Sequence, residues 1–245
     1  MSIINRVVLV AGASKGIGKA IALQAGKEGA YVIVNYNSDA QGADKVVTEI
    51  GTGRALAVQA DISKPADIDR LINTSIARFS KIDVVIPNAA YVPLSDVETA
   101  TEDQFDMAFA VNVKGPWLLV QKSLPYMSSG SAVIFISSDL TDSSTLPPQL
   151  FLYISTKGAL NTMARSLAQT LANRGIRVNA VSPGPTETDS FFKSNTDGSS
   201  RMLAELSPFK RLGKPDEAAA AVSLLWRPES SWISGQIVKV NGAAT

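Results

Sequence analysis

Short apolar segments alternate with helix-like segments along the whole chain, and this alternation restricts the possible folds more than any other feature. The short segments are apolar at nearly every position, as in YVIVN at 31–35, which is typical of strands buried on both faces. The longer segments carry apolar residues at helical spacing. We therefore expect an α/β fold in which helices cover both faces of a parallel sheet. Strands are expected at 6–10, 31–35, 54–59, 82–86, 131–136, 176–181 and 236–240, and helices at 15–28, 40–50, 63–79, 101–127, 153–172 and 215–226.

Signals for the start of a helix precede three of these segments. Ser63 stands before Pro65 at the start of the third helix, and both residue types favour such positions. Thr101 and Gln104 have the spacing of a capping box. Asp39 is expected to cap the second helix, because aspartate favours the N-cap position.

The longest stretch without a regular pattern covers residues 183–214. Large apolar side chains, among them Phe191, Phe192 and Met202, are interspersed there with Ser, Thr, Gly and Pro. Loops of this length are uncommon and often functional, so we expect an apolar substrate lid at about 185–213. Because the chain shows no linker, repeat or low-complexity tract, we expect a single domain over residues 1–245.

The absence of histidine and cysteine excludes several kinds of site. A Ser-His-Asp triad, a thiol nucleophile and a Cys/His zinc site each need a residue that the chain lacks, and we expect no metal site. Lys plus Arg number 23 and Asp plus Glu 22, for a formal net charge of +1 without a long basic run, so we expect no nucleic-acid binding. No segment approaches the ~20 apolar residues of a membrane span, and no targeting segment is visible. We therefore expect a cytoplasmic protein that does not bind membranes.

The turn after the first strand is rich in glycine, with the sequence AGASKGIG at 11–18. Gly12, Gly16 and Gly18 permit a tight turn and a close approach of backbone N–H groups to a diphosphate, and the following helix directs its positive end to the same place. A P-loop is disfavoured, because Gly18-Lys19 is followed by alanine and not by Ser or Thr. The alternative is a glycine-rich turn without a ligand, but a strand before it and a helix after it favour dinucleotide binding.

Tyr153 and Lys157 are four residues apart on an expected helix and therefore share one face. A free tyrosine hydroxyl has a pKa near ~10, and a cation close by lowers it. In a chain without histidine, this tyrosine is the most credible proton donor at neutral pH. The same spacing is also common on ordinary solvated helix faces.

Motifs in order over nearly the whole chain resemble those of the short-chain dehydrogenases/reductases. AGASKGIG resembles the family's cofactor loop, and PNAA at 87–90 resembles its Asn-Ala-Gly segment after the fourth strand. SPGPTETD at 182–189 and the closing VNGA match as well. The resemblance implies a Rossmann-type, doubly wound NAD(P)-binding domain with a seven-stranded parallel sheet in the order 3-2-1-4-5-6-7. The family's Asn-Ser-Tyr-Lys tetrad is matched by Asn112 in VNVKG, Ser138 in FISS, and Tyr153 and Lys157 in YISTK.

The resemblance implies a catalytic role for each member of this tetrad. Tyr153 exchanges a proton with the carbonyl or alcohol oxygen, and Lys157 lowers the pKa of Tyr153 and binds the nicotinamide ribose. Ser138 hydrogen-bonds the substrate oxygen, and Asn112 holds a water that connects Lys157 to solvent. Purely structural interpretations stand beside these: Ser138 as a strand-end cap with Ser137 as its rival, and Asn112 as a partner for backbone groups.

A nicotinamide cofactor is also implied, and the end of the second strand favours NADP(H). NAD-selective sites place Asp or Glu there, whereas this chain has Tyr36, Asn37 and Ser38. Lys15 is expected near the 2′-phosphate, as is typical of NADP-using relatives, and Asp39 is the one acid close by. The expected cofactor-binding residues are Gly12, Ser14, Lys15, Gly16, Ile17, Gly18, Tyr36, Asn37, Ser38, Asp61, Ile62, Asn88, Ala89, Ala90, Tyr153, Lys157, Pro183, Gly184, Thr186 and Thr188.

The chain departs from the family's pattern at three places. Ala11 replaces the usual threonine, whose hydroxyl ties the glycine loop to the segment after the fourth strand, and Ala90 replaces a glycine. The distance in sequence from Ser138 to Tyr153 is longer than the commonest family spacing. We expect the stretch 141–152 to reshape the mouth of the substrate site.

The expected substrate is a medium or bulky, largely apolar ketone, such as a quinone-like polyketide, which is reduced to a secondary alcohol. No arginine stands among the expected pocket side chains to hold a carboxylate. A 3-oxoacyl thioester is the next candidate, and a non-catalytic NADP-binding Rossmann protein is a further alternative. Epimerases and dehydratases on this fold usually carry a large C-terminal substrate domain, for which the chain leaves no room. The expected pocket residues are Tyr91, Val92, Leu94, Leu140, Leu146, Leu150, Phe191, Phe192 and Met202.

Self-association is expected from the family resemblance and from the composition. Members of the family are usually tetramers or dimers that pack segments matching 101–127 and 153–173 across a two-fold axis. Charged residues make up 18% of the chain, below the usual ~25%, which fits surface buried between subunits. We expect a homotetramer or a homodimer.

Overall fold

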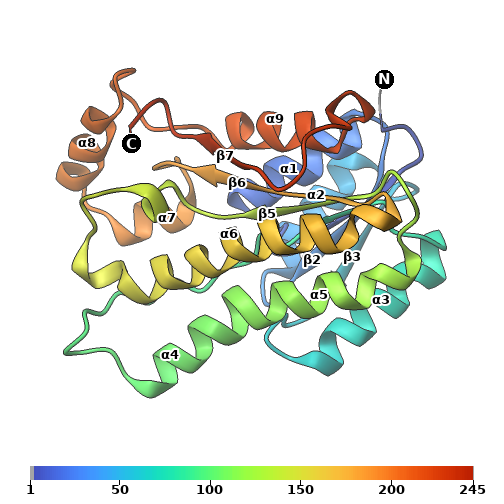
Figure 1. Ribbon diagram of the computed structural model, residues 1–245, viewed down its shortest axis with the longest axis horizontal. Coiled ribbons are helices and arrows are strands. Elements are labelled where there is room, and N and C mark those ends of the chain that lie inside the picture. Colours follow the sequence, from blue (N-terminus) through green and yellow to red (C-terminus); the bar gives the residue numbers. More distant parts are fainter. Residues whose placement is uncertain (1–2, 245) are drawn as a thin grey trace.

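A seven-stranded parallel sheet forms the centre of the molecule in the computed structural model, which describes residues 3–244 (Figure 1). The strand order is β3-β2-β1-β4-β5-β6-β7, as the family resemblance implied. The order reverses between β1 and β4, and in open α/β sheets ligands bind at such a point, outside the carboxyl ends of the strands. The strands are β1 Val7–Val10, β2 Tyr31–Tyr36, β3 Ala55–Gln59, β4 Val84–Ile86, β5 Ala132–Ile136, β6 Arg177–Pro183 and β7 Ile237–Val240.

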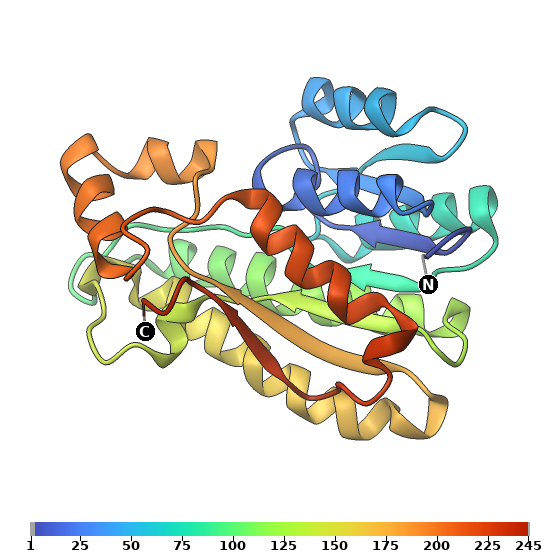
Figure 2. The same cartoon turned by 90° about the horizontal axis from the view of Figure 1, so that it is seen from above.

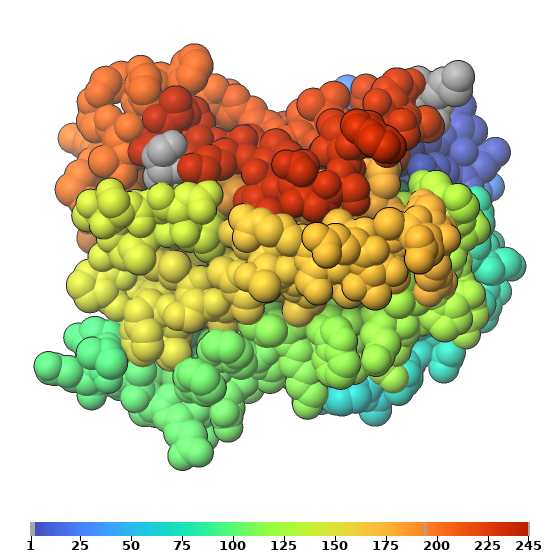
Figure 3. Space-filling model, viewed as in Figure 1, coloured from blue at the N-terminus to red at the C-terminus, as the bar shows by residue number. Residues whose placement is uncertain are grey.

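Helices cover both faces of the sheet and bury two separate apolar cores. Successive strand residues point to opposite faces, so that Val8 enters one core and Leu9 the other. On the first face lie α1 Gly16–Lys27, α2 Ala40–Ile50 and α9 Pro215–Trp226. On the second lie α3 Pro65–Phe79, α5 Gly115–Ser123 and α6 Phe151–Leu171, and α4 Glu102–Phe109 precedes α5 along the same line (Figure 1). Figure 3 shows α4, α5 and α6 side by side, in green and yellow, on this second face.

The expected elements agree with the observed ones to within a few residues, but one expected cap is wrong. Asp39 accepts a hydrogen bond from the N–H of Gly42 at 3.0 Å and caps α2, and the capping box of Thr101 and Gln104 is confirmed at the start of α4. The N-cap of α3 is Lys64 and not Ser63. The Ser63 hydroxyl donates to Asp61 instead, at 2.7 Å.

The expected helix 101–127 is interrupted by a wider turn. A π-helical segment, Ala110–Lys114, separates α4 from α5, and a 3₁₀ turn, Leu124–Tyr126, follows α5. Single π-helical turns often occur at functional sites, and this one contains Asn112. Further short 3₁₀ segments lie at Asp139–Asp142, Pro148–Leu150, Ala172–Arg174 and Pro228–Ser230.

The stretch 183–214 is more regular than expected, because it contains two helices. These are α7 Asp189–Ser194 and α8 Asp197–Leu206, and the side chains of Thr188 and Thr196 cap them. Figure 2 shows both helices beside the C-terminus, at the end of the molecule opposite the N-terminus. Since the parallel strands direct their carboxyl ends the same way, α7 and α8 stand over the edge at which a ligand is expected.

Within residues 3–244, no helix combines the length and the hydropathy that crossing a lipid bilayer requires.

Candidate active site

A cavity of about 760 Å³ opens where the carboxyl ends of β1, β2, β4, β5 and β6 meet. Its size lies within the range of about 300–1,000 Å³ that is usual for ligand pockets. The wall runs without a break from the glycine loop to α7 and α8. It includes eighteen of the expected cofactor-binding residues: Gly12, Ser14, Lys15, Gly16, Ile17, Gly18, Tyr36, Asn37, Ser38, Asn88, Ala89, Ala90, Tyr153, Lys157, Pro183, Gly184, Thr186 and Thr188.

The glycine loop forms a cradle that side chains would fill. Gly12 has a φ of +66°, and a Cβ atom there would lie 2.8 Å from the Cα of Ala89. A Cβ at Gly18 would collide with the carbonyl oxygen of Gly12 and with the side-chain amide of Asn88. The loop therefore needs glycine at these positions, and α1 begins within it, at Gly16, so that the N–H groups of its first turn face the same place. This arrangement fits the diphosphate of a dinucleotide.

Asparagine side chains hold the loop in place from two directions. The Nδ2 atom of Asn88 donates to the carbonyl oxygens of Ala11 and Gly12, at 3.0 Å each. The buried Oδ1 atom of Asn35, on β2, accepts from the N–H of Gly12 at 3.2 Å. Asn88 thus ties the loop to the segment after β4 without the hydroxyl that Ala11 lacks.

Tyr153, Ser138 and Lys157 meet on the opposite wall of the cavity. Tyr153 and Lys157 lie one turn apart on α6, and the Lys157 Nζ atom is 5.4 Å from the centre of the Tyr153 ring. Nζ donates to the carbonyl oxygen of Ile136 at 2.7 Å. The hydroxyl of Ser138 interacts with that of Tyr153 and also accepts a 3.4 Å hydrogen bond from the N–H of Leu140. Ser138 therefore is both a cap and a neighbour of Tyr153.

Ser137, the other candidate for the role of Ser138, does not direct its hydroxyl to Tyr153. Its hydroxyl is buried and donates to the backbone carbonyl of Lys157 at 3.4 Å. Of the two serines, only Ser138 acts on the Tyr153 hydroxyl.

Burial changes the proton affinities of the two α6 side chains. The pKa of Tyr153 is raised to about 12, mainly by burial and also by the charge of Asp139, while the hydrogen bond with Ser138 opposes the rise. Burial also lowers the pKa of Lys157 to about 8. The Tyr153 pKa is therefore shifted opposite to the direction implied by the resemblance. The hydroxyl stays protonated at neutral pH, which is the form that a proton donor needs.

Asn112 pairs with backbone groups of the segment after β4. The side chain is fully buried in the π-helical turn. Its Oδ1 accepts from the N–H of Tyr91 and its Nδ2 donates to the Tyr91 carbonyl, both at 2.8 Å. Nδ2 also donates to the hydroxyl of Thr156 at 3.1 Å. Asn112 thus fixes the segment after β4 to α6.

At the far end of the cavity, one cation and one anion stand close together. Lys15 is exposed, and Asp39 lines the same wall. The hydrogen bond from Gly42 is the main cause of a lowered Asp39 pKa, and Ser14 and Lys15 lower it as well. Asp39 therefore carries a negative charge beside Lys15, in addition to capping α2.

The comparisons with known proteins agree over almost the full length. A family model described as enoyl-(acyl carrier protein) reductase matches residues 12–245. An uncharacterized oxidoreductase of Methylorubrum extorquens is 39% identical over 242 residues, covering 97% of each chain. Versicolorin reductase stcU of Emericella nidulans is 36% identical over 253 residues, covering 98% of this chain and 96% of that protein.

The chain belongs to the short-chain dehydrogenase/reductase family. It is thus an oxidoreductase of that family. A solved short-chain reductase of the same fold is the angucycline C-6 ketoreductase LanV with bound NADP. Its TM-score is 0.93 at 32% identity, and the match covers 99% of this chain and 96% of that chain.

Some expected residues of this short-chain dehydrogenase/reductase lie outside the cavity wall. Asp61 accepts hydrogen bonds from the backbone and hydroxyl of Ser63, and Ile62 is buried. Among the expected pocket residues, Val92, Leu94, Leu140, Leu150, Phe191 and Met202 line the cavity, whereas Tyr91, Leu146 and Phe192 do not. Leu146 and Phe192 turn toward solvent, with 45% and 54% of their surface exposed.

Other lining residues were not anticipated from the sequence. They are mainly polar side chains that the sequence places in turns and in the stretch 183–214, where polar residues carry no distinguishing signal. They include Asp139, Gln149, Asn195 and Ser199, together with the apolar Leu203.

Proposed function

We propose that the protein is an NADPH-dependent ketoreductase that reduces a medium or bulky, largely apolar ketone to a secondary alcohol. The observation that carries the proposal is the meeting of a protonated tyrosine, Tyr153, with Ser138 in the same cavity as a glycine cradle. The versicolorin reductase and the angucycline ketoreductase support it as relatives that match over almost their whole length.

In the proposed mechanism, two hydroxyl groups act on the carbonyl oxygen. NADPH, when bound along the glycine loop, supplies the hydride that reduces the carbonyl carbon. Ser138 donates a hydrogen bond to the oxygen and stabilises its developing negative charge. Tyr153 donates a hydrogen bond and then its proton, so that the oxygen becomes an alcohol hydroxyl. The resulting phenolate is stabilised by the ammonium of Lys157 beneath the ring.

The remaining residues keep these groups in place. Asn112 holds the Tyr91 backbone and Thr156 together, and Thr156 in turn donates to the carbonyl of Tyr153 at 2.6 Å. The side-chain amide of Asn112 is occupied by these partners, and we propose a positioning role for Asn112. Lys157 is 2% exposed, and its Nζ is held by Ile136, so it faces the ribose side of the cavity from a fixed position.

The preference for NADPH rests on the residues at the end of β2. Tyr36, Asn37 and Ser38 line the cavity and carry no negative charge. Lys15 supplies a positive charge for the 2′-phosphate, and hydrogen bonds to charged groups contribute about 1.5–3 kcal/mol. Asp39 opposes this attraction, so the preference is clear but not absolute.

The substrate end of the cavity is mostly apolar. Leu94, Leu150 and Phe191 line it, and within the described residues the charged side chains at this end of the wall are Asp139, Lys157 and Asp189. We propose that residues 1–245 act as one NAD(P)-binding domain with α7 and α8 as its lid. A polyol or free sugar needs a polar partner for most of its hydroxyl groups, and the wall offers Gln149, Asn195 and Ser199 among a larger number of apolar side chains.

A panel of ketones tests the function directly. Consumption of NADPH with aryl, alkyl and polycyclic ketones should exceed that with polyols or sugars. Better activity on a 3-oxoacyl thioester than on any other ketone would favour the thioester reductase, the next candidate from the sequence. Tight NADPH binding without turnover of any carbonyl compound would favour a non-catalytic binding protein.

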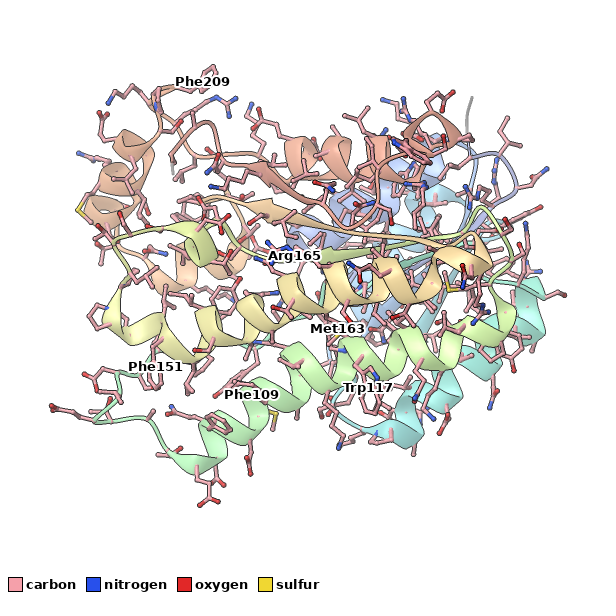
Figure 4. The ribbon with its side chains drawn as sticks, viewed as in Figure 1. Phe109, Trp117, Phe151, Met163, Arg165 and Phe209 are labelled. Carbon is pink, nitrogen blue, oxygen red and sulfur yellow. The ribbon has the colours of Figure 1, made fainter. Side chains whose placement is uncertain are left out.

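We also propose a cytoplasmic homotetramer or homodimer that packs the face formed by α4, α5 and α6. On this face Phe105, Met107 and Trp117 are 47%, 46% and 44% exposed. Figure 4 shows Phe109, Trp117 and Phe151 on the same row of helices. Aromatic and methionine side chains are enriched at interfaces. Light scattering at micromolar concentration should report a tetramer or a dimer, and a stable monomer would contradict the proposal.

A further inference from the structure

A buried carboxylate, that of Asp139, lies in the wall of the same cavity as the hydroxyl groups of Ser138 and Tyr153. Asp139 follows Ser138 at the end of β5, lines the cavity and is 3% exposed. The Asn241 amide donates to its Oδ2 atom at 3.4 Å. A Cβ atom at Gly184 would lie 3.1 Å from the same oxygen. The carboxylate is thus enclosed between the active site and the end of β7.

No ion pair reaches this carboxylate from the part of the chain that the structure describes. Lys239 on β7 is near enough to lower the pKa of Asp139, but its Nζ pairs with Asp142 at 3.5 Å. Burial raises the Asp139 pKa above its ordinary value, and the hydrogen bonds from Asn241 and from the backbone of Leu140 only partly oppose the rise. The negative charge of Asp139 is therefore buried with only partial compensation.

Tyr153 is surrounded by few other charges. Lys157 lies beneath its ring on α6, and the hydroxyl of Ser138 faces it from the end of β5. The remaining charged side chains that line the cavity are Lys15, Asp39 and Asp189. Among all of these, Asp139 is the one whose charge raises the pKa of Tyr153 and so favours the protonated hydroxyl.

We propose that Asp139 is a positioning residue of the reaction: its carboxylate holds the Tyr153 hydroxyl in the protonated form and so biases this site toward reduction of carbonyl groups. The inference rests on the proposed function. In reduction, the carbonyl carbon gains a hydride from NADPH, the oxygen gains the proton of the Tyr153 phenol, and NADP⁺ is released. In the reverse direction the phenolate must accept the alcohol proton. A negative charge beside the hydroxyl disfavours the phenolate and therefore slows the reverse direction at neutral pH.

The central test titrates Tyr153 without substrate or cofactor. NMR of protein carrying ¹³C-labelled tyrosine, with Tyr153→Phe to assign the signal, measures the phenolate fraction at a fixed alkaline pH at which circular dichroism verifies the fold. Asp139→Asn keeps the shape of the side chain and removes its charge. We expect a phenolate-to-phenol ratio at Tyr153 about tenfold higher in this variant, which corresponds to roughly one pH unit. An unchanged ratio in a folded variant would overturn the proposal.

Asp142→Asn is the matched control, because Asp142 lies in the same 3₁₀ segment but is 41% exposed and paired with Lys239. It should leave the Tyr153 signal within twofold of the native ratio. An equal rise in both variants would mean that general charge, and not Asp139, sets the ionisation of Tyr153. If Asp139→Asn does not fold, Asp139→Glu keeps the charge, and a native ratio in that variant supports the proposal, whereas a raised ratio contradicts it.

The pH dependence of activity gives a second readout once a ketone substrate and its alcohol product have been identified. The pH dependence of kcat/KM for alcohol oxidation should move to lower pH in Asp139→Asn, and the alkaline fall of ketone reduction should move with it. A change in both rates without a shift of either profile would assign Asp139 a structural role only. If no ketone is reduced at all, the proposed function fails, whereas the NMR titration still decides the role of Asp139.

Discussion

The side-chain amide of Asn88 donates to the carbonyl oxygens of Ala11 and Gly12, at 3.0 Å each, and so joins the glycine loop after β1 to the segment after β4. These two segments flank the point at which the strand order reverses. This side chain therefore connects the two walls of the crevice at which ligands bind in open α/β sheets. The chain makes this link with asparagine, where the family commonly adds a threonine hydroxyl at position 11.

Asn88→Ala should weaken cofactor binding. The change leaves two carbonyl oxygens without their donor, and each lost hydrogen bond of this kind costs about 0.5–1.5 kcal/mol. We expect the Kd for NADPH to rise by about tenfold, with a fall in the thermal midpoint. Fluorescence titration and calorimetry measure the two quantities, and native values of both would contradict the role given to Asn88.

Gly12→Ala should abolish tight cofactor binding, because Gly12 has a positive φ and its missing Cβ would lie 2.8 Å from Ala89. Relieving this contact must widen the crevice. Gly53→Ala is the control, since nothing lies within 4 Å of a Cβ at that position. Titration with NADPH should give a Kd at least about tenfold higher for the first variant, and a native Kd for the second. Equal affinities would show that the cradle does not hold the cofactor.

Lys15→Ala should raise the KM for NADPH by about tenfold and leave that for NADH almost unchanged, because only NADPH carries the 2′-phosphate. Lys19→Ala is the control, since Lys19 lies on α1 but not in the cavity wall. The measurement is kcat/KM with both cofactors and one ketone. A native enzyme that prefers NADH would mean that Asp39, and not Tyr36, faces the ribose.

Glu28 should make stability depend on pH. It joins α1 to α9, accepting hydrogen bonds from Ser223 at 2.5 Å, Arg227 at 3.0 Å and Trp226 at 3.1 Å. Burial alone would raise its pKa, but these donors and Gln24 lower it below its ordinary value of 4.5. The stabilisation is therefore complete above pH 4.5 and is lost as the pH falls through the lowered pKa of the folded state.

Glu28→Gln should accordingly lower the free energy of unfolding at neutral pH by about 1–3 kcal/mol, as expected for hydrogen bonds to a charged group. The difference from the native protein should shrink in acid. Urea unfolding over a range of pH measures it. A difference that stays constant down to the acid limit would show that Glu28 acts by shape and not by charge.

The apolar strands and the order of the motifs were sufficient to predict the sheet and most helix boundaries. The π-helical turn at Asn112 was not predictable, because it depends on how the Asn112 amide pairs with the Tyr91 backbone across the fold. The helices α7 and α8 did carry a signal. Thr188-Asp189 and Thr196-Asp197 each place a favoured cap before an acidic first turn, and the Ser- and Gly-rich composition of the stretch masked it.

The site residues were predictable where the chemistry requires a particular type of side chain. They were less predictable where a residue belongs to the site only because of where the fold places it. Tyr153 and Lys157 stand out in a chain without histidine. Asp139 did not, since an aspartate after a strand usually lies in a solvated turn. Leu146 and Phe192 were misassigned to the pocket because an apolar side chain in a loop near a cavity can equally turn outward, and both do so here.

The most direct test of the account is the turnover number for ketone reduction by Tyr153→Phe, measured together with its Kd for NADPH. The change keeps the ring and removes the hydroxyl. Tyr126→Phe, at a 37% exposed tyrosine outside the cavity wall, serves as the control. We predict a fall in kcat of at least about 100-fold, the usual contribution of a general acid, with NADPH affinity preserved and the control unaffected. Near-native turnover by Tyr153→Phe would contradict the assignment of Tyr153 as the proton donor.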